Sequence, residues 1–272
     1  MLCAALLLAA TVGHQAMTGT SDTKPVNVKF RPSQWKLTWS DEFNKGDAPD
    51  PAIWRYDVGK MYNNELQYCT DNRRENTRIE HGRLILEARK EPMGGLNYTS
   101  GRINTSGKKT FLYGRIEVRA KLPSGRGTWP AIWMLGQDIG QTGWPRCGEL
   151  DIMEFVGFDP DRVHANVHVD AYNYMKGNGH GNNMAVGHLT DRFNTYAIEW
   201  YEDRIEFFFN TTRYLVYRKE SNDDKVWPFS KPQFLILNLA IGGDWGGQKG
   251  VDDAMFPAKY EIEYVRYYER VK

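Results

Sequence analysis

The sequence predicts an all-β protein whose strands form an antiparallel sandwich or barrel. Several segments alternate polar and apolar residues, which is the period of a strand with one buried and one exposed face. The clearest are residues 83–89, 114–122 and 260–268. Gly, Pro, Asn and Asp separate such segments at short intervals, as is typical of antiparallel all-β domains. A length of 272 residues suits one large domain or two small ones, and we expect one.

The start of the chain differs from the rest. Residues 1–12 are nearly all apolar and too few to cross a bilayer as a helix, which is typical of a signal peptide. No Lys or Arg precedes Lys24, so the charged start of such a signal is missing. We expect a signal peptide over residues 1–20 with a truncated start, a loose leader over 21–34, and export to an extracellular or periplasmic space. The alternative is an apolar N-terminus on a cytosolic protein.

One catalytic domain is expected over residues 35–272. A short helical stretch of a turn or two is expected at 225–229, and no segment carries the pattern of a long helix. The strands that we expect, in chain order, are residues 36–39, 83–89, 114–122, 204–209 and 260–268.

The three cysteines leave two alternatives open. Cys3 lies in the expected signal peptide, whereas Cys69 and Cys147 lie beside candidate site segments. These two pair in an oxidising compartment or remain as two buried thiols. Their spacing is not that of a metal site.

Composition limits the classes of partner. The formal net charge is +1, without a basic stripe or an acidic tail, so we expect neither a nucleic acid nor a membrane as partner. Aromatic residues make up 13% of the chain, including 9 Trp and 15 Tyr. Such a content indicates either a surface that stacks on flat ligands or a β-rich core.

Three carboxylates lie close together in residues 148–154. Glu149, Asp151 and Glu154 alternate with apolar residues that read as buried strand. Burying like charges near one another is costly unless they are paired or shifted in pKa, which favours a catalytic use. Two carboxyl groups facing one cleft are what glycoside hydrolysis needs. The alternatives are a solvated strand edge or a metal site of three carboxylates.

Strand geometry sets a condition on this cluster. Side chains alternate between the two faces of a strand, so Glu149 and Asp151 share a face and Glu154 points away. One extra residue near 152–153, where two apolar residues are adjacent, would form a β-bulge and return Glu154 to the same face. Five residues of strand span about 16 Å. Sheet curvature and two long side chains must close most of that gap to the roughly 5–5.5 Å of retaining enzymes.

The wider sequence resembles glycoside hydrolase family 16. Residues 129–134, followed by 144–154, carry the resemblance, which is greatest to laminarinase-type endo-β-1,3-glucanases and their mixed-linkage relatives. Further matching pieces are residues 39–43, 64–68, 100–105, 238–243 and 264–266. The resemblance implies a β-jelly-roll sandwich of two curved antiparallel sheets, with an open cleft on the concave one.

The resemblance also implies a mechanism. Glu149 would be the nucleophile and Glu154 the acid/base of a retaining double displacement that needs no cofactor, with Asp151 as hydrogen-bond partner and pKa tuner. The expected function is endo-acting hydrolysis of β-1,3-glucan or mixed-linkage β-1,3/1,4-glucan by a monomer. Alternatives are a non-catalytic β-glucan-binding protein, or a transglycosylase or galactanase of the same fold.

Candidate sugar-binding residues are mostly aromatic. Trp129, Trp133 and Trp144 precede the catalytic segment, and we expect two of them to be platforms and one to be core. Trp245, on a Gly-rich loop, is expected to face the ligand. Further candidates come from the resemblance, namely Asn64, Arg102, His168 and Asn238.

Each of these further candidates has a plainer alternative. For Arg102 it is a surface ion pair. His164 and His168 could form a zinc pair, but no third ligand lies nearby. Residues 171–188 are longer than the family's usual connection, and we expect them to shape one end of the cleft.

A structural calcium is expected on the convex side from the resemblance alone. Its ligands would be Glu42, the backbone of Gly82, and Glu263, all oxygen donors of the kind that calcium prefers. Glu263 stands where the family usually has Asp.

Overall fold

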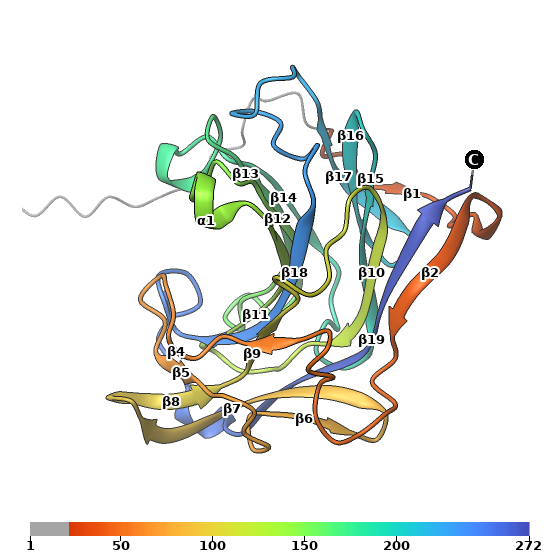
Figure 1. Cartoon of the computed structure of the whole chain (residues 1–272). Helices are drawn as coiled ribbons and strands as arrows, with labels where there is room; N and C mark the ends of the chain where they lie inside the picture. The colour runs from red at the N-terminus through yellow and green to blue at the C-terminus, as the bar shows by residue number, and fades with distance from the viewer. Residues whose placement is uncertain (1–21, 272) are drawn as a thin grey trace, which may run out of the picture.

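Two stacked β-sheets make up the fold in the computed structural model, which describes residues 22–271 (Figure 1). The seven-stranded sheet runs in the order β14 (His180–Ala185), β13 (Arg162–His168), β12 (Glu149–Glu154), β11 (Thr128–Gly136), β18 (Gln233–Ile241), β9 (Arg102–Asn104) and β3 (Arg55–Tyr56). All of its pairings are antiparallel.

The twelve-stranded sheet covers the other side of the core. Its path is β1 (Val26–Asn27), β17 (Thr212–Arg218), β16 (Arg204–Phe209), β15 (Asn194–Trp200), β10 (Gly114–Lys121), β19 (Ala258–Arg270), β7 (Arg83–Met93), β8 (Leu96–Ser100), β5 (Gln67–Cys69) and β4 (Gly59–Lys60). Off this path, β2 (Trp35–Asp41) pairs with β19 and β6 (Thr77–Glu80) pairs with β7. The helical elements are short: α1 (Ile139–Thr142), η1 (Pro32–Gln34), η2 (Tyr174–Lys176) and η3 (Asp253–Met255).

The core lies between the two sheets. Leu150, Ile152 and Met153 of β12 are fully buried in it, so the catalytic segment is anchored by its apolar face. Strand β18 is buried on both faces, because Phe234 and Ile236 join Leu135 and Cys147 in a second apolar cluster. That second cluster packs against Trp133, Ile139 and Trp144. The seven-stranded sheet therefore carries apolar side chains on its outer face as well.

The predicted all-β sandwich is confirmed, and each expected strand is present. Residues 225–229 form turns without a helix. The expectation of a loose leader is wrong for residues 26–27, which pair with β17 as strand β1. The expected signal peptide lies outside the described residues. Within the described part of the chain, no helix is long and apolar enough to cross a membrane.

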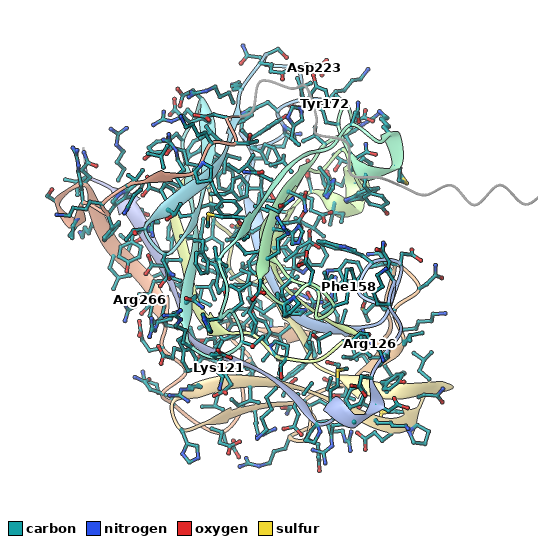
Figure 2. The ribbon with its side chains drawn as sticks, turned by 180° about the vertical axis from the view of Figure 1, so that it is seen from behind. Lys121, Arg126, Phe158, Tyr172, Asp223 and Arg266 are labelled. Atoms are coloured by element: carbon teal, nitrogen blue, oxygen red, sulfur yellow. The ribbon has the colours of Figure 1, made fainter. Side chains whose placement is uncertain are left out.

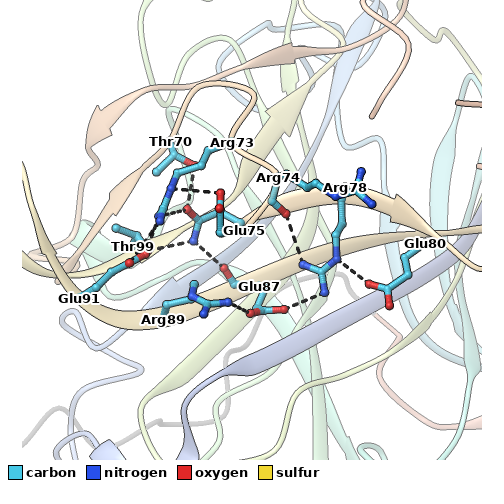
Figure 3. Close-up of polar contacts among 11 residues, drawn as sticks. Thr70, Arg73, Arg74, Glu75, Arg78, Glu80, Glu87, Arg89, Glu91 and Thr99 are labelled. Atoms are coloured by element: carbon cyan, nitrogen blue, oxygen red, sulfur yellow. Dashed lines mark hydrogen bonds and ion pairs between the residues drawn. The ribbon is translucent and has the colours of Figure 1, made fainter. Parts of the chain in front are cut away.

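The outer face of the twelve-stranded sheet carries paired charges. Figure 2 shows the molecule from behind, with Lys121 on β10 and Arg266 on β19 of this sheet. Figure 3 shows Arg78 bridging Glu80 and Glu87, while Arg89 binds the other oxygen of Glu87. Because the Glu87 side chain is only 3% exposed, this pairing holds a buried charge in place.

Candidate active site

A β-bulge in β12 brings the three carboxylates to one face. Asp151 pairs with Asn166 of β13, but Glu154 pairs with His164, so the register shifts by one residue between them. The pairing of β12 with β11 shifts at the same place, since Met153 pairs with Ile132 and Asp151 with Trp133. The predicted bulge is therefore confirmed at Ile152, the residue left out of both pairings.

Gly148 starts this strand for a steric reason. Its φ is 79°, in the left-handed region that favours glycine. A Cβ at this position would lie 2.6 Å from a ring carbon of Pro228 and 2.9 Å from Phe229. Glycine therefore lets the chain enter β12 close to these two side chains, and Glu149 follows at once with its side chain on the cleft face.

The three carboxylates line one cavity on the outer face of the seven-stranded sheet. Glu149, Asp151 and Glu154 border it together with Trp129 and Trp133 of β11. A larger cavity of about 600 Å³ adjoins it and shares five lining residues with it. The shared residues are Tyr62, Asn63, Arg102, Trp133 and Glu149. Together the two cavities form the cleft.

Indole and amide groups hold the two glutamates. The Trp144 Nε1–H donates to Glu149 Oε2. Glu154 accepts two hydrogen bonds, from Trp129 Nε1 at 3.1 Å and from Asn166 Nδ2 at 2.7 Å. Each carboxylate is thus fixed by donors from a neighbouring strand or loop, which keeps both side chains directed into the cleft.

His168 completes the cluster by pairing with the middle carboxylate. Its Nε2 lies 3.3 Å from Asp151 Oδ2, and Asp151 is only 3% exposed. In the strand register His168 stands opposite Glu149. The imidazole therefore supplies the one positive charge that faces the three acids from β13.

Burial raises the pKa of all three carboxyl groups. For Glu149, burial acts most strongly and the nearby Asp151 carboxylate adds to it. For Asp151, burial is followed by repulsion from Glu154. Burial also raises the pKa of Glu154, against the opposing effects of His168, Asn166 and Trp129. The cluster therefore retains a proton more readily than separate carboxyl groups would, which a general acid requires.

Two further candidates form a polar and aromatic wall. Trp133 Nε1 donates to Asn238 Oδ1 at 2.7 Å. The Arg102 guanidinium lies 4.8 Å from the Trp133 ring and 5.7 Å from the Tyr62 ring. Its Nε also donates to Asp57 at 2.8 Å, so the alternative of an ion pair is correct as well, but inside the cleft.

Two candidates lie elsewhere than expected. Asn64 is exposed and donates to Asp244 at 2.7 Å, while its neighbour Asn63 lines both cavities. Trp245 is half-buried and meets the Trp129 and His164 rings edge-on at 5.7 and 4.8 Å. It does not line either cavity, so its contacts are those of a support for Trp129.

The structure adds cleft residues that the sequence did not reveal. They come from loops, where neither strand alternation nor the family motifs give a signal. These residues are Tyr62, Asn63, Glu65, Tyr174 and Met175.

Both described cysteines are free and buried. Burial raises the pKa of the Cys69 thiol to about 12 and that of Cys147 to about 11. Of the two alternatives left open by the sequence, the structure has the unpaired thiols.

The residues expected to hold calcium do not fit that ion. Arg266 donates to both oxygens of Glu42 at 2.9 Å, and this pairing lowers the pKa of Glu42. Arg119 donates to Glu263, with Arg83 at 3.9 Å. Because guanidinium groups already hold both carboxylates, the oxygen ligands that calcium needs are occupied. Nothing in the arrangement adds a role for Gly82.

The catalytic cluster is the one group within the described residues whose geometry suits a metal ion. Ligand atoms of Glu149, Asp151 and His168 lie within 4.8 Å of one another. His164 is not part of this group, so the expected zinc pair of two histidines is not formed. The same three side chains are the ones that the hydrolytic chemistry uses.

A concave sheet with two facing, indole-bound glutamates and an aromatic cleft defines a glycoside hydrolase. Comparison with known proteins agrees. The profile described as "Glycosyl hydrolases family 16" matches residues 63–266. The chain belongs to this family, and the β-jelly-roll sandwich follows with it.

Individual relatives are similar over nearly the whole chain. A β-glucanase of Rhodothermus marinus is 46% identical over 278 residues, covering 98% of this chain and 94% of the relative. The structure of SCLam, a non-specific endo-β-1,3(4)-glucanase, matches with a TM-score of 0.87 and 43% identity, over 91% of this chain and 99% of SCLam. The Rhodothermus marinus laminarinase structure matches with a TM-score of 0.83 and 48% identity, over 89% of this chain and all of that one (100%).

Proposed function

We propose that this protein cuts β-1,3-glucan or mixed-linkage β-1,3/1,4-glucan within the chain, by a retaining double displacement. The observation that carries the proposal is the bulge at Ile152, because it alone brings Glu154 into the cavity that holds Glu149 and Asp151. The relatives support the substrate, since those most similar are a β-glucanase, a laminarinase and a β-1,3(4)-glucanase.

In the first step Glu149 and Glu154 act together. A carboxylate oxygen of Glu149 bonds to the anomeric carbon as the bond from that carbon to the leaving oxygen breaks. Glu154 gives its proton to the leaving oxygen, so the departing sugar leaves as a neutral alcohol. The product is a glycosyl ester on Glu149 with inverted configuration.

In the second step water enters on the side that the leaving sugar has vacated. Glu154, now a carboxylate, takes one proton from the water as its oxygen bonds to the anomeric carbon. The ester bond to Glu149 breaks, and a second inversion restores the original configuration. No cofactor takes part, and the proton that Glu154 gives in the first step is replaced by the one it takes from water in the second.

The surrounding residues keep these two roles apart. The Trp144 N–H stabilises negative charge on Glu149 as that carboxylate is released. Asn166 and Trp129 orient Glu154, while burial keeps its pKa raised, as proton donation requires. His168 balances the charge of Asp151, which otherwise opposes ionisation of Glu149.

Product analysis tests the reaction and the substrate together. The enzyme would be incubated in parallel with laminarin, barley mixed-linkage glucan, xyloglucan and agarose. We expect oligosaccharides of several lengths from the first two, as internal cleavage requires. Absence of products from both would contradict the substrate. Transfer products in place of shorter sugars would favour a transglycosylase, and binding without products a glucan-binding protein.

We also propose export of the enzyme and action as a monomer. Export is supported by the apolar run over residues 1–12 and by the large size of the polymeric substrate. Expression of the full chain, followed by mass determination of the protein outside the cytoplasm, tests this. A product that stays inside with residues 1–20 attached would contradict export, and light scattering measures the oligomeric state.

A further inference from the structure

An apolar wall closes one end of the larger cavity. Tyr174 and Met175, at the tip of η2, belong to this wall and are 59% and 66% exposed. Tyr62, which is 69% exposed, borders the same cavity. Exposed apolar side chains gathered around a cavity mark a ligand-binding surface more often than chance exposure. The other apolar members of the wall are Leu135, Ile139, Trp144, Phe234 and Ile236.

The turn that presents these side chains is held firmly. Asn173 is buried, and its Nδ2 donates to the Val169 carbonyl at 3.0 Å while its Oδ1 accepts from the Lys176 N–H at 3.3 Å. The Asn173 N–H donates to Asn178 Oδ1 at 3.2 Å, and Gly177 takes the left-handed conformation that ends the turn. A preorganised turn loses little entropy when a ligand binds, so it can add affinity directly.

The wall is continuous with the catalytic residues. The Tyr174 ring lies 5.5 Å from the Trp144 ring at an interplanar angle of 39°, and 5.7 Å from the His168 ring. Trp144 in turn donates to Glu149. A sugar chain leaving the nucleophile along this wall would therefore pass from Trp144 to Tyr174 without crossing open solvent.

The carboxylates show which half of the substrate this wall would contact. Glu149 borders the larger cavity, whereas Asp151 and Glu154 do not. The nucleophile bonds to the glycone sugar, and the acid stands beside the oxygen of the leaving aglycone. The larger cavity therefore lies on the glycone side of the cleavage point.

We propose that Tyr174 and Met175 are specificity-determining residues, which bind a glucosyl residue of the glycone chain beyond the one bonded to Glu149. The phenol ring and the thioether would cover the C–H face of a pyranose. Arg102 and Asp57 border the same cavity and would bind hydroxyls at its edge. This inference rests on the proposed function and assigns a binding role to the long segment 171–188.

Kinetics on substrates of graded length test the proposal. Linear β-1,3-glucan oligosaccharides of increasing glycone length would carry the same chromogenic aglycone. For Tyr174→Ala and Met175→Ala, we expect KM for the long glycones to rise roughly tenfold more than KM for the shortest. Tyr174→Phe keeps the ring and should keep the wild-type length dependence. Leu37→Ala, which removes a side chain of 47% exposure on β2, is the matched control.

Other outcomes would overturn the inference. An equal loss at every glycone length, or a fall in kcat with an altered pH profile, would show that Tyr174 acts only by supporting Trp144. A loss that follows aglycone length would place the wall on the other side of the cleavage point. Failure of the wild-type enzyme to hydrolyse any of these substrates would contradict the proposed function instead. Wild-type hydrolysis with unchanged length dependence in both alanine variants would overturn this inference alone.

Discussion

Replacing the nucleophile should abolish activity and stabilise the protein at neutral pH. Glu149→Gln removes one negative charge but keeps the shape of the side chain, and its amide oxygen can still accept the Trp144 N–H. Removal of a catalytic nucleophile typically lowers kcat by about 10⁴-fold or more. Binding of oligosaccharide should remain, because the cleft walls are unchanged.

The gain in stability follows from the raised pKa of Glu149, caused by burial and by Asp151. A carboxyl group whose pKa is higher in the folded state binds its proton more tightly there. Folding is therefore disfavoured as the pH rises from the unfolded-state pKa of about 4.3 towards the folded-state pKa. Each unit of difference costs about 1.4 kcal/mol at neutral pH, or about 3–6 °C in Tm for a domain of this size. The neutral amide of the glutamine variant has no such cost.

Calorimetry at two pH values checks this sign. We expect Glu149→Gln to unfold at a higher temperature than the wild type at pH 7, and the difference to vanish near pH 4, where the wild-type carboxyl is largely protonated in both states. Glu202→Gln, at an exposed position, is the control for removing a charge. A variant that is equally or less stable than the wild type at pH 7, or that retains kcat, would refute the reasoning.

Three further predictions concern the cluster and the opposite sheet. Asp151→Asn removes a charge that raises the pKa of Glu149, so the acidic limb of the kcat/KM profile should move to lower pH; a shift to higher pH would contradict the pairing. Glu87→Ala leaves Arg78 buried without its partner and should lower the free energy of unfolding by about 3–5 kcal/mol in a urea titration, whereas a change under about 1 kcal/mol would show that the pair is not holding a buried charge. Removal of calcium by a chelator should leave Tm unchanged, because arginines hold the expected ligands, and a clear fall would restore the calcium site.

Strand geometry explains why the catalytic cluster could be predicted. In a strand the side-chain period is fixed, so two adjacent apolar residues between acids of opposite parity have few solutions, and the bulge at Ile152 is the one observed. The loops have no such period. Asn63 and Asn64 both take left-handed φ values, of 53° and 54°, so alternation gives no guide to which side chain enters the cleft.

Tertiary packing decided the remaining positions. A Trp on a Gly-rich loop suggests an exposed platform, yet Trp245 packs edge-on against two rings that come from β11 and β13. The expected calcium ligands failed for a similar reason, because Arg266 and Arg119 reach Glu42 and Glu263 across neighbouring strands. No local pattern in the sequence records such contacts.

The two faces of β12 oppose each other energetically. Leu150, Ile152 and Met153 contribute the burial that fixes the strand in the core, while Glu149 and Asp151 on the other face disfavour the folded state once ionised. The bulge shifts the strand register within this one segment, so both sets of side chains keep their own face. It follows that the cost of holding a reactive cluster is met by the same strand that carries it. Substitutions that weaken the apolar face should therefore lower activity by releasing the bulge, even where no substituted residue contacts the sugar.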